Sequence, residues 1–569
     1  MQTRWEMRKI NREYALRLQQ THQIPFPIAR ALAARSLTEE EVPDFLDPRL
    51  SNLSDPFLLP AMKEAVARIL LAIDREEPMV VFGDYDVDGI TATALLVQML
   101  KALGGKVEPF IPQRLEEGYG LSKPALKRCL QEHAPALLIS VDCGTNAKES
   151  VDWVIAQKVD VIITDHHEPV GELATPLALV NPKLDTNSKT KFLAGVGVAF
   201  KVAHAILKQA KQMRAKYADA IDLRNFLDLV ALGTVADIVP LYGENRILVR
   251  HGLFRMARTQ TPGLQALKSV SGMRNDPPNT YHLGFQMAPR INAAGRIAQP
   301  LKALHLLLTK DRSEARHLAE FLDQTNRSRQ KMEQQMFLEA FEEIDTYFDP
   351  QTSFGLVVAR EGWHPGVIGI VASRIARRYH RPTVVLGIEN EKVHGSCRSI
   401  EGYEILEGLK ACSAHLQEYG GHKMAAGLRM AASEVDAFRT CFNQSVKSTI
   451  PSEALLPRIL LDAEVLPMEL NLEFFKAQEK LAPFGEGNRE PLWIMRAMRC
   501  VGSPRVVGQK HLKFFCQSEK GGQRFEAIAF NFPEEDLPKN GSVDLAFHLK
   551  VWGKELQLQI QQIRPTRTE

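Results

Sequence analysis

Acidic residues and histidines follow three apolar runs in the first third of the chain. The runs span 78–82, 136–141 and 159–164, and the residues that follow them are Asp84, Asp86 and Asp88, then Asp142, then Asp165, His166 and His167. If the runs are parallel strands, their carboxyl ends meet at one edge of a sheet, where ligands bind. Carboxylates crowded at that edge raise one another's pKa, and a divalent cation removes this cost. The pattern predicts a metal site at this edge.

The types of side chain in this set indicate which ion it holds. Oxygen and imidazole ligands without clustered thiolates favour Mn²⁺ or Mg²⁺ over a structural zinc, and the seven cysteines form no CxxC pair. Four or more carboxylates suggest two ions about 3.5–4 Å apart, the arrangement that serves in-line displacement at phosphorus. Asp237 follows an apolar helical stretch and could close the site. A single DxD after a strand is more often a helix N-cap, but the combination after three successive runs favours the metal interpretation.

The runs alternate with helical patterns, which predicts an α/β fold with a parallel sheet and helices on both faces. A fourth run, 175–180, completes this part, and residues 195–258 have mostly helical spacing. Residues 311–348 contain neither Gly nor Pro, which predicts one long helix of roughly 55 Å as a spacer. A second α/β pattern opens at 354–360. From about residue 456, short alternating runs predict a small all-β barrel.

At roughly 150 residues per domain, the 569 residues suggest about four domains. We expect a two-lobe architecture whose parts follow one another along the chain. They are an N-terminal helical arm (1–55), an α/β domain with the predicted metal site (56–311), a connecting helix (312–348), a second α/β domain (349–449) and a β-barrel resembling an OB-fold (455–569).

The composition is that of a globular chain, with 45% hydrophobic and 24% charged residues. With 71 basic and 68 acidic residues the net charge is only +3, so any nucleic-acid surface must be local. No apolar run reaches the roughly 18 residues of a membrane span, and the charged N-terminus has no secretory pattern. We therefore expect a cytoplasmic protein without a membrane partner. The absence of a GxxxxGK[ST] phosphate loop disfavours an NTPase.

Four motifs in this order resemble those of the DHH phosphoesterase superfamily: GDYDVDG, SVDCGT, TDHHEP and GTVADIVPL. Five further segments resemble the bacterial single-strand-specific exonucleases of that superfamily: MAPRINAAGRI, GWHPGVIGIVASRIARRYHRPTVV, GSCRS, GGHKMAAG and LAPFGEGNREP. The resemblance extends from about Pro25 to Pro565. It implies a 5′→3′ exonuclease on single-stranded DNA that uses Mn²⁺ or Mg²⁺, releases 5′-mononucleotides and works in DNA repair and recombination.

The resemblance also implies roles for residues. The metal ligands would be Asp84, Asp86, Asp88, Asp142, His166 and Asp237. His167 would face the scissile phosphate, with Asp142 and Asp84 as its catalytic neighbours, and hydrolysis would need no covalent intermediate. We expect Asp142 to bridge both ions, because its run lies between the other two in chain order. Many superfamily members have a His a few residues before the DxD where this chain has Phe82, which leaves the ligands of the first ion open.

Five residues are predicted to bind the substrate: Arg114, Arg296, Ser396, Arg398 and His422. Ser396 and Arg398 are two apart on an extended segment, so their side chains point the same way, although an exposed strand edge would look similar. Arg offers a planar fork for a phosphate. Two glycines before His422 allow backbone N–H groups to approach an anion, and a helix C-cap is the alternative. By resemblance, Arg114 and Arg296 lie near the entering 5′ end.

The C-terminal runs interleave aromatic and basic residues, a pattern that can stack bases within a basic groove. The residues are Phe514, Phe515, Phe525, Phe530 and Phe532 with Lys510, Lys513 and Arg524, and we expect one or two of these rings to be exposed. The expected partner is single-stranded DNA, with a single-strand-binding protein and a helicase as further candidates. We expect the chain to be a monomer.

Two rival functions remain. One is a phosphodiesterase for oligoribonucleotides or cyclic dinucleotides, whose relatives usually lack the spacer and barrel. The other is a non-catalytic replication scaffold, whose relatives lose metal ligands.

Overall fold

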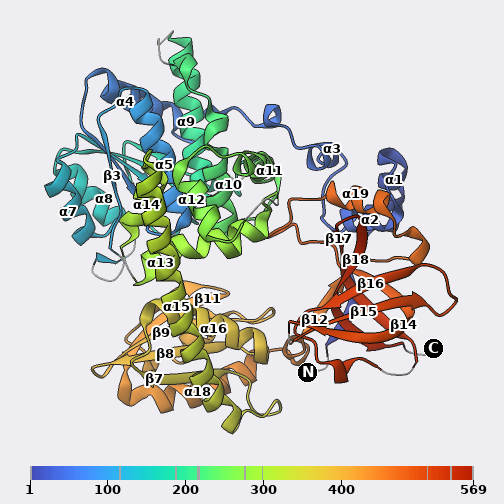
Figure 1. The fold of residues 1–569 in the computed structure, drawn as a ribbon. Helices are drawn as coiled ribbons and strands as arrows, with labels where there is room; N and C mark the ends of the chain where they lie inside the picture. The colour runs from blue at the N-terminus through green and yellow to red at the C-terminus, as the bar shows by residue number, and fades with distance from the viewer. Residues whose placement is uncertain are drawn as a thin grey trace. The chain divides into compact units, whose positions relative to one another are not determined.

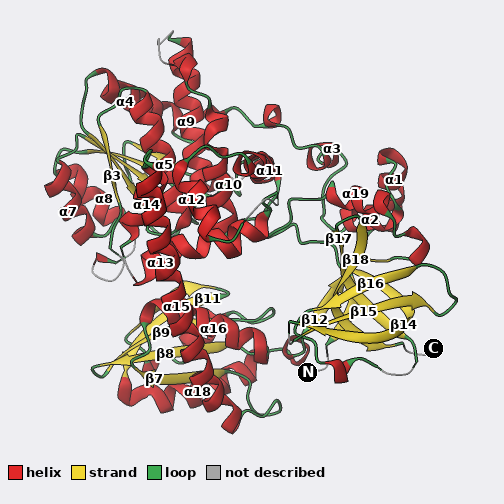
Figure 2. Ribbon diagram, in the orientation of Figure 1, coloured by secondary structure: helices red, strands yellow, loops and turns green. Residues whose placement is uncertain are grey.

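The structure is a computed structural model that describes residues 3–113, 117–118, 120–185, 189–213, 218–273, 277–297, 299–508, 510–538 and 541–566. Two compact units make up the chain. One unit consists of Glu6–Gly295, Gln299–Glu320 and Leu460–Glu569, and the other of Phe321–Ile459 with two short pieces, Met1–Trp5 and Arg296–Ala298. Strands gather in several separate sheets (Figure 2), and each unit is described by itself.

A five-stranded parallel sheet of order β3-β2-β4-β5-β6 forms the centre of the first unit. Its strands are β2 (Met79–Gly83), β3 (Val107–Phe110), β4 (Leu137–Val141), β5 (Asp160–Thr164) and β6 (Ala178–Val180). All residues of β2 and β4 are buried, as expected for apolar strands with helices on both faces. The predicted parallel sheet is confirmed. The edge strand β3 could not be recognised from the sequence, because its Glu and Pro interrupt the apolar pattern.

Helices cover both faces of this sheet. One face carries α4 (Met62–Asp74), α5 (Val87–Ala102) and α9 (Gly195–Gln212), and the other α7 (Lys123–His133) and α8 (Lys148–Ala156). A further layer packs on α5 and α9. It contains α10 (Leu227–Ala236), α11 (Gly243–Ala257), α12 (Pro262–Val270), the π-helical turn η6 (His282–Met287), α13 (Ala288–Ile297) and α14 (Pro300–Leu308). Among the described residues, no helix combines the length and apolar character needed to cross a bilayer.

The C-terminal part of the first unit is the predicted β-barrel. Strand β14 pairs with both β15 and β17, and β15, β16, β18 and β17 complete the circuit, so the sheet closes on itself. The strands are β13 (Ala463–Glu464), β14 (Trp493–Val507), β15 (His511–Ser518), β16 (Arg524–Ala529), β17 (Val543–Trp552) and β18 (Glu555–Pro565), and α19 (Leu472–Glu479) precedes β14.

The N-terminal helices share the core of this barrel. Buried side chains of α1 (Arg12–His22), α2 (Phe26–Ala33) and α3 (Val42–Leu46) belong to one apolar cluster with those of the barrel strands and α19. In Figure 1 the blue α1 and α2 lie beside the orange α19. Within the expected N-terminal helical arm (1–55), these three helices therefore share a core with the C-terminal barrel, because their short apolar faces need a partner far along the chain.

The second unit contains a mixed sheet of order β10-β11-β9-β8-β7. Its strands are β7 (Leu356–Glu361), β8 (Thr383–Glu389), β9 (Lys392–Arg398), β10 (Glu418–His422) and β11 (Ala425–Ala431), and its helices α16 (Pro365–Tyr379), α17 (Ile405–Ala411) and α18 (Val435–Thr449). The long helix predicted over 311–348 is confirmed as α15 (Arg312–Tyr347). Met336, Ala340 and Ile344 pack its second half against α16 and β7.

Candidate metal centre

Loops after three neighbouring strands meet at one edge of the parallel sheet. Strand β4 lies between β2 and β5, so Asp142 stands between the loop of Asp84 and Asp86 and the loop of His166 in space as well as in sequence. Asp142 has a φ of 62°, a left-handed conformation that non-glycine residues rarely adopt. Backbone strain of this kind is concentrated at functional sites.

Three carboxylates converge on one ring nitrogen of His166. Its Nε2 lies 3.1 Å from Asp142 Oδ1, 3.5 Å from Asp237 Oδ2 and 3.8 Å from Asp88 Oδ2. Three sets have ligand atoms within 4.8 Å of one another: Asp142, His166 and His167; Asp88, His166 and Asp237; Asp84, Asp86 and Asp142. The structure therefore brings together all six residues that the sequence analysis proposed as metal ligands, and Asp142 belongs to two of the sets.

Several of the converging atoms lack a hydrogen bond. Asp142 Oδ1, His166 Nε2 and Asp237 Oδ2 are buried and have no hydrogen-bond partner among the described residues. Buried polar atoms are nearly always hydrogen-bonded, and a site that binds an ion is one reason for an exception. Oxygen and imidazole atoms that face a shared point fit a hard divalent cation such as Mn²⁺ or Mg²⁺.

Electrostatics in this cluster lead to the same interpretation. Burial, followed by the charge of neighbouring carboxylates, raises the pKa of Asp88 to about 7 and that of Asp237 to about 9, and raises the pKa of Asp142 well above its ordinary value. Burial lowers the pKa of His166 to about 3, so its ring is neutral and able to ligate. Such crowding is unfavourable without a cation, and a divalent ion would hold the carboxylates in their charged form.

The second and third aspartates of the first motif also shape the local backbone. Asp86 is the N-cap of α5, where its Oδ1 accepts from Gly89 N at 3.1 Å, so the capping interpretation holds alongside the metal one. Asp88 accepts from Gly195 N and Val196 N, at 2.6 and 2.8 Å, which fixes the start of α9 against the cluster.

Gly195 is a residue of the site that sequence reasoning missed. A Cβ on Gly195 would stand 2.6 Å from Asp142 Oδ1, so only glycine lets α9 begin this close to the carboxylate. The sequence carried no signal beyond a glycine at the start of a helical stretch. The requirement comes from a contact between segments about fifty residues apart.

Replacing Gly195 by Ala is expected to displace Asp142 and weaken metal binding. We expect a loss of about 10- to 100-fold in Mn²⁺ affinity, the range typical of residues that orient metal ligands, measured by Mn²⁺ titration of the purified variant. Gly197→Ala is the matched control, because the atoms nearest to a Cβ there belong to the Leu193 side chain, at 3.0 Å and beyond, and not to a metal ligand. Equal Mn²⁺ affinity in the two variants would contradict this role of Gly195.

Asp165 positions His167. Its Oδ1 lies 2.7 Å from His167 Nδ1, and its Oδ2 accepts from Thr145 N at 2.9 Å. Burial disfavours the charged form of both side chains, but the hydrogen bond and the charge attraction between them outweigh it. The pKa of His167 is therefore raised, and that of Asp165 is held well below its ordinary value. The hydrogen bond to Asp165 fixes the orientation of the His167 ring. The sequence places Asp165 at this edge of the sheet but indicates no role for it.

A second cluster gathers three predicted substrate-binding residues in the other unit. Arg398 donates to Ser396 Oγ at 3.1 Å and to Ser373 Oγ at 3.1 Å, so Ser396 and Arg398 lie together on β9 as expected. A Cβ on Gly369 of α16 would stand 2.9 Å from Ser396 Oγ. Arg296 donates to Gly366 O at 3.1 Å, in the first turn of α16. Arg296 therefore lies at the start of α16, a favourable place for an anion, whereas Ser396 and Arg398 lie against its second and third turns.

Arg114 and His422 are the remaining two candidates for substrate binding. Arg114 lies outside the described residues. His422 is exposed at the end of β10. Ala425 of β11 pairs with His422 on one side and with Arg398 of β9 on the other, so His422 and Arg398 lie in one row across the sheet, two strand spacings or about 10 Å apart. The alternative of a helix C-cap at the paired glycines is wrong, because residues 418–422 form a strand. Gly421 has a φ of 147°, and a Cβ there would stand 2.5 Å from Ala425 O.

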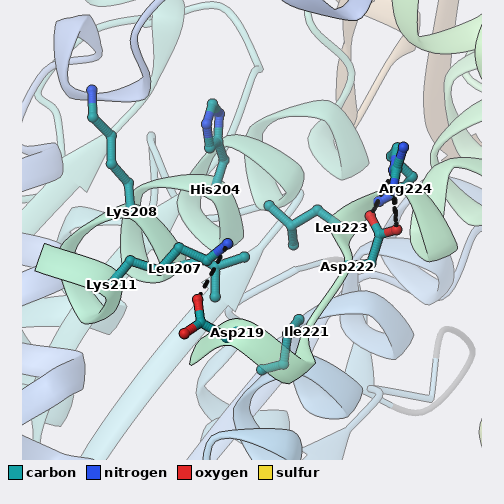
Figure 3. A pocket seen from close by; sticks show the side chains of 9 residues that line it. All are labelled: His204, Leu207, Lys208, Lys211, Asp219, Ile221, Asp222, Leu223 and Arg224. Atoms are coloured by element: carbon teal, nitrogen blue, oxygen red, sulfur yellow. Dashed lines mark hydrogen bonds and ion pairs between the residues drawn. The ribbon is translucent and has the colours of Figure 1, made fainter. Parts of the chain in front are cut away.

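A separate hollow of about 550 Å³ lies at the far end of α9 (Figure 3). Its cations have carboxylate partners, with Lys208 2.7 Å from Asp55 and Arg224 2.7 Å from Asp222. His204, which also lines it, is nine residues beyond the start of α9, about 13 Å along the axis. Because its charges are balanced and it is remote from the metal ligands, we assign it no part in the site.

The fold and the site are those of the DHH class of proteins. Residues 78–234 match the model of the DHH family N-terminal domain, and residues 353–448 match the DHHA1 domain. Residues 461–562 match the RecJ OB domain. The chain belongs to the RecJ family, whose curated members carry the name single-stranded-DNA-specific exonuclease RecJ.

Relatives from several bacteria cover most of the chain. The protein of Haemophilus influenzae is 35% identical over 91% of this chain and 93% of its own length. That of Bacillus subtilis is 38% identical over 93% of this chain, which spans 66% of the relative. The solved structure of RecJ from Thermus thermophilus in complex with Mn²⁺ covers 100% of this chain, which covers 80% of it, with a TM-score of 0.83 and 30% identity. A second solved structure, exonuclease RecJ bound to manganese, is 36% identical over 71% of this chain and 97% of its own, with a TM-score of 0.60.

Proposed function

We propose that this chain is an exonuclease specific for single-stranded DNA, which degrades its substrate from the 5′ end by hydrolysis and releases 5′-mononucleotides. The observation that carries the proposal is the convergence of Asp142, His166 and Asp237 on one buried point, with ligand atoms that have no hydrogen-bond partner among the described residues. Family membership supplies the class of substrate.

Two ions, Mn²⁺ or Mg²⁺, are the proposed cofactors. Asp84 and Asp86 would hold one ion, and Asp88, His166 and Asp237 the other, with Asp142 shared between them. When bound, such ions supply an activated water and neutralise charge on the phosphate. Asp165 is hydrogen-bonded to Nδ1 of His167 and raises its pKa, which favours the protonated ring that would donate to a phosphate oxygen as negative charge develops on it.

The barrel is the proposed binding surface for the strand beyond the metal centre. Phe514 and Phe525 are buried, whereas Phe515 and Phe530 are exposed, which confirms the expectation of one or two exposed rings. The Arg524 guanidinium lies 3.8 Å from the centroid of the Phe515 ring. A ring and a cation presented together can stack a base and follow a phosphate.

The wider role rests on the family resemblance. We propose that the enzyme works in DNA repair and recombination in the cytoplasm, as a monomer, with a single-strand-binding protein and a helicase as partners. Of the rival functions, a non-catalytic scaffold is disfavoured because every motif carboxylate and histidine is present and converges. A cyclic-dinucleotide phosphodiesterase is disfavoured by the spacer helix α15 and the barrel.

Digestion of end-labelled DNA tests this function. Single-stranded and duplex oligonucleotides labelled at the 5′ or 3′ end are incubated with Mn²⁺, Mg²⁺ or EDTA. We expect mononucleotides to be released from the single strand only, with the 5′ label lost first, and no cleavage in EDTA. Equal digestion of duplex DNA, or loss of the 3′ label first, would contradict the proposal.

Replacing Arg398 by Ala is expected to reduce discrimination at the 5′ end of the substrate. A charge-assisted contact to a phosphate contributes about 1.5–3 kcal/mol, so the preference for a 5′-phosphate over a 5′-hydroxyl should fall by roughly 10- to 150-fold. The ratio of kcat/KM for the two ends measures it. If both ends lose activity equally, Arg398 is structural or contacts the scissile group instead.

A further inference from the structure

Two exposed aromatic rings form a stacked pair on the first unit. The side chains of Tyr281 and Phe285 are 59% and 71% exposed, and their ring centroids lie 5.1 Å apart with the planes at 28°. Tyr281 directly precedes η6 and Phe285 lies within it, a π-helical turn that continues into α13. Turns of this kind occur often at functional sites. The proposed catalytic roles leave this pair without a function.

The helical segment that carries the pair is fixed to two segments that hold metal ligands. Gly284 packs on α10, where a Cβ would stand 3.5 Å from a methyl group of Val235, two residues before Asp237. Further along, Asn292 Oδ1 accepts from Val87 N at 3.2 Å, between Asp86 and Asp88.

The rings of Tyr281 and Phe285 lie a short distance along the helical segment from Asn292, which contacts the loop of Asp86 and Asp88. Asn292 lies seven positions after Phe285, about 10 Å along a helix. Ile238, the residue after Asp237, adds an apolar side chain that is 68% exposed. Its φ of 60° is unusual for a β-branched residue. The rings therefore stand near the metal centre, within the reach of the nucleotides adjoining it.

The other end of the segment leads to the barrel. Thr280 Oγ1 donates to Phe484 O at 2.5 Å, and Leu241 N donates to Glu486 O at 2.9 Å. Residues 484 and 486 belong to the connection that enters β14. The stacked pair thus occupies the stretch of surface between the metal centre and the barrel, both within one unit.

We propose that Tyr281 and Phe285 form a stacking platform for bases of the substrate strand on its way from the metal centre to the barrel. The inference rests on the proposed function. Continuity with the metal centre favours a nucleic-acid strand over a protein partner. Every base offers a flat π-face, so such a platform holds a strand without regard to its sequence.

The test combines variants of the platform with oligonucleotides that lack single bases. Binding of a fluorescent single strand is measured in EDTA, for the full base sequence and for strands with an abasic site at each successive position from the 5′ end. Phe285→Ala and Tyr281→Ala should weaken binding of the full strand by about 5- to 100-fold, the loss expected for one stacked base. For a strand with an abasic site at one particular position, the variant and the wild type should bind with the same affinity.

Phe254→Ala is the matched control. This ring is 64% exposed and lies on α11. Gly252, two residues earlier on α11, packs against Leu227, which is at the opposite end of α10 from Asp237. The Phe254→Ala variant should bind all strands like the wild type, and Phe285→Tyr, which keeps the ring, should retain affinity. Unchanged binding in Phe285→Ala and Tyr281→Ala, or a loss that is equal wherever the abasic site lies, would overturn the proposal.

The outcomes for the platform and for the proposed function separate cleanly. If the wild type digests single strands but no abasic position couples to the platform, the inference fails and the proposed function stands. If the wild type cleaves no single strand, the proposed function fails. If the effect of the platform variants on affinity still depends on one abasic position, the chain would be a single-strand-binding protein without nuclease activity.

Discussion

Replacing Asp142 by Ala is expected to abolish cleavage of single-stranded DNA while the fold remains intact. Asp142 contributes to two of the three ligand sets, so its loss affects both proposed ions. Metal stabilisation of the phosphate contributes several kcal/mol, and each 1.4 kcal/mol is tenfold, so we expect kcat to fall by at least about a hundredfold. Release of labelled mononucleotide in Mn²⁺ measures the rate, and circular dichroism checks the fold.

The fold of this variant should be no less stable than the wild type without metal. Removing a buried carboxylate whose pKa is raised by burial and by neighbouring carboxylates relieves repulsion. Asp152→Ala, an exposed change on α8, is the control and should cleave normally. Substantial activity in purified Asp142→Ala protein would falsify the two-metal interpretation.

The second large effect is expected at His167. Removing one donor that faces developing charge costs roughly 10²–10³ in kcat, so His167→Ala should lose activity in that range. Asp165→Asn keeps His167 but removes the carboxylate that holds its Nδ1, and should lose about 10- to 100-fold. Steady-state kinetics on a single-stranded oligonucleotide separate kcat from KM for both variants.

Mn²⁺ binding distinguishes the two possible roles of His167. If it only faces the phosphate, His167→Ala should bind Mn²⁺ like the wild type and lose kcat alone. The ring also belongs to a potential ligand set with Asp142 and His166. A fall in Mn²⁺ affinity together with kcat would show that His167 is a metal ligand, and the proposed role would be wrong.

The parts of the fold with strong local patterns could be predicted from the sequence. Strands β2, β4 and β5 consist mostly of apolar residues, and α15 is a long stretch without Gly or Pro, so periodicity and composition identify them. The position of the first three aspartates and of Asp142 after adjacent strands followed from parallel-sheet geometry. The sequence alone does not place Asp237 beside them, because helix spacing does not show where α10 ends in space.

Features that depend on contacts between distant segments could not be predicted. The N-terminal helices pack into the barrel, and Arg246 is buried with its guanidinium donating to the carbonyls of Leu481 and Ala482, at 2.9 and 2.7 Å. A basic residue on a helix ordinarily indicates a solvated face. The close approach of Gly195 to Asp142 and the stacking of Tyr281 on Phe285 likewise arise only from the folded arrangement.

The number of Mn²⁺ ions bound per chain tests the central claim most directly. Free Mn²⁺ is measured by electron paramagnetic resonance while the ion is titrated into the full-length wild type and into Asp142→Ala. We predict two bound ions for the wild type and fewer for the variant, with cleavage lost in parallel. One ion or none in the active wild type, or two ions in Asp142→Ala, would contradict a two-metal centre built on Asp142.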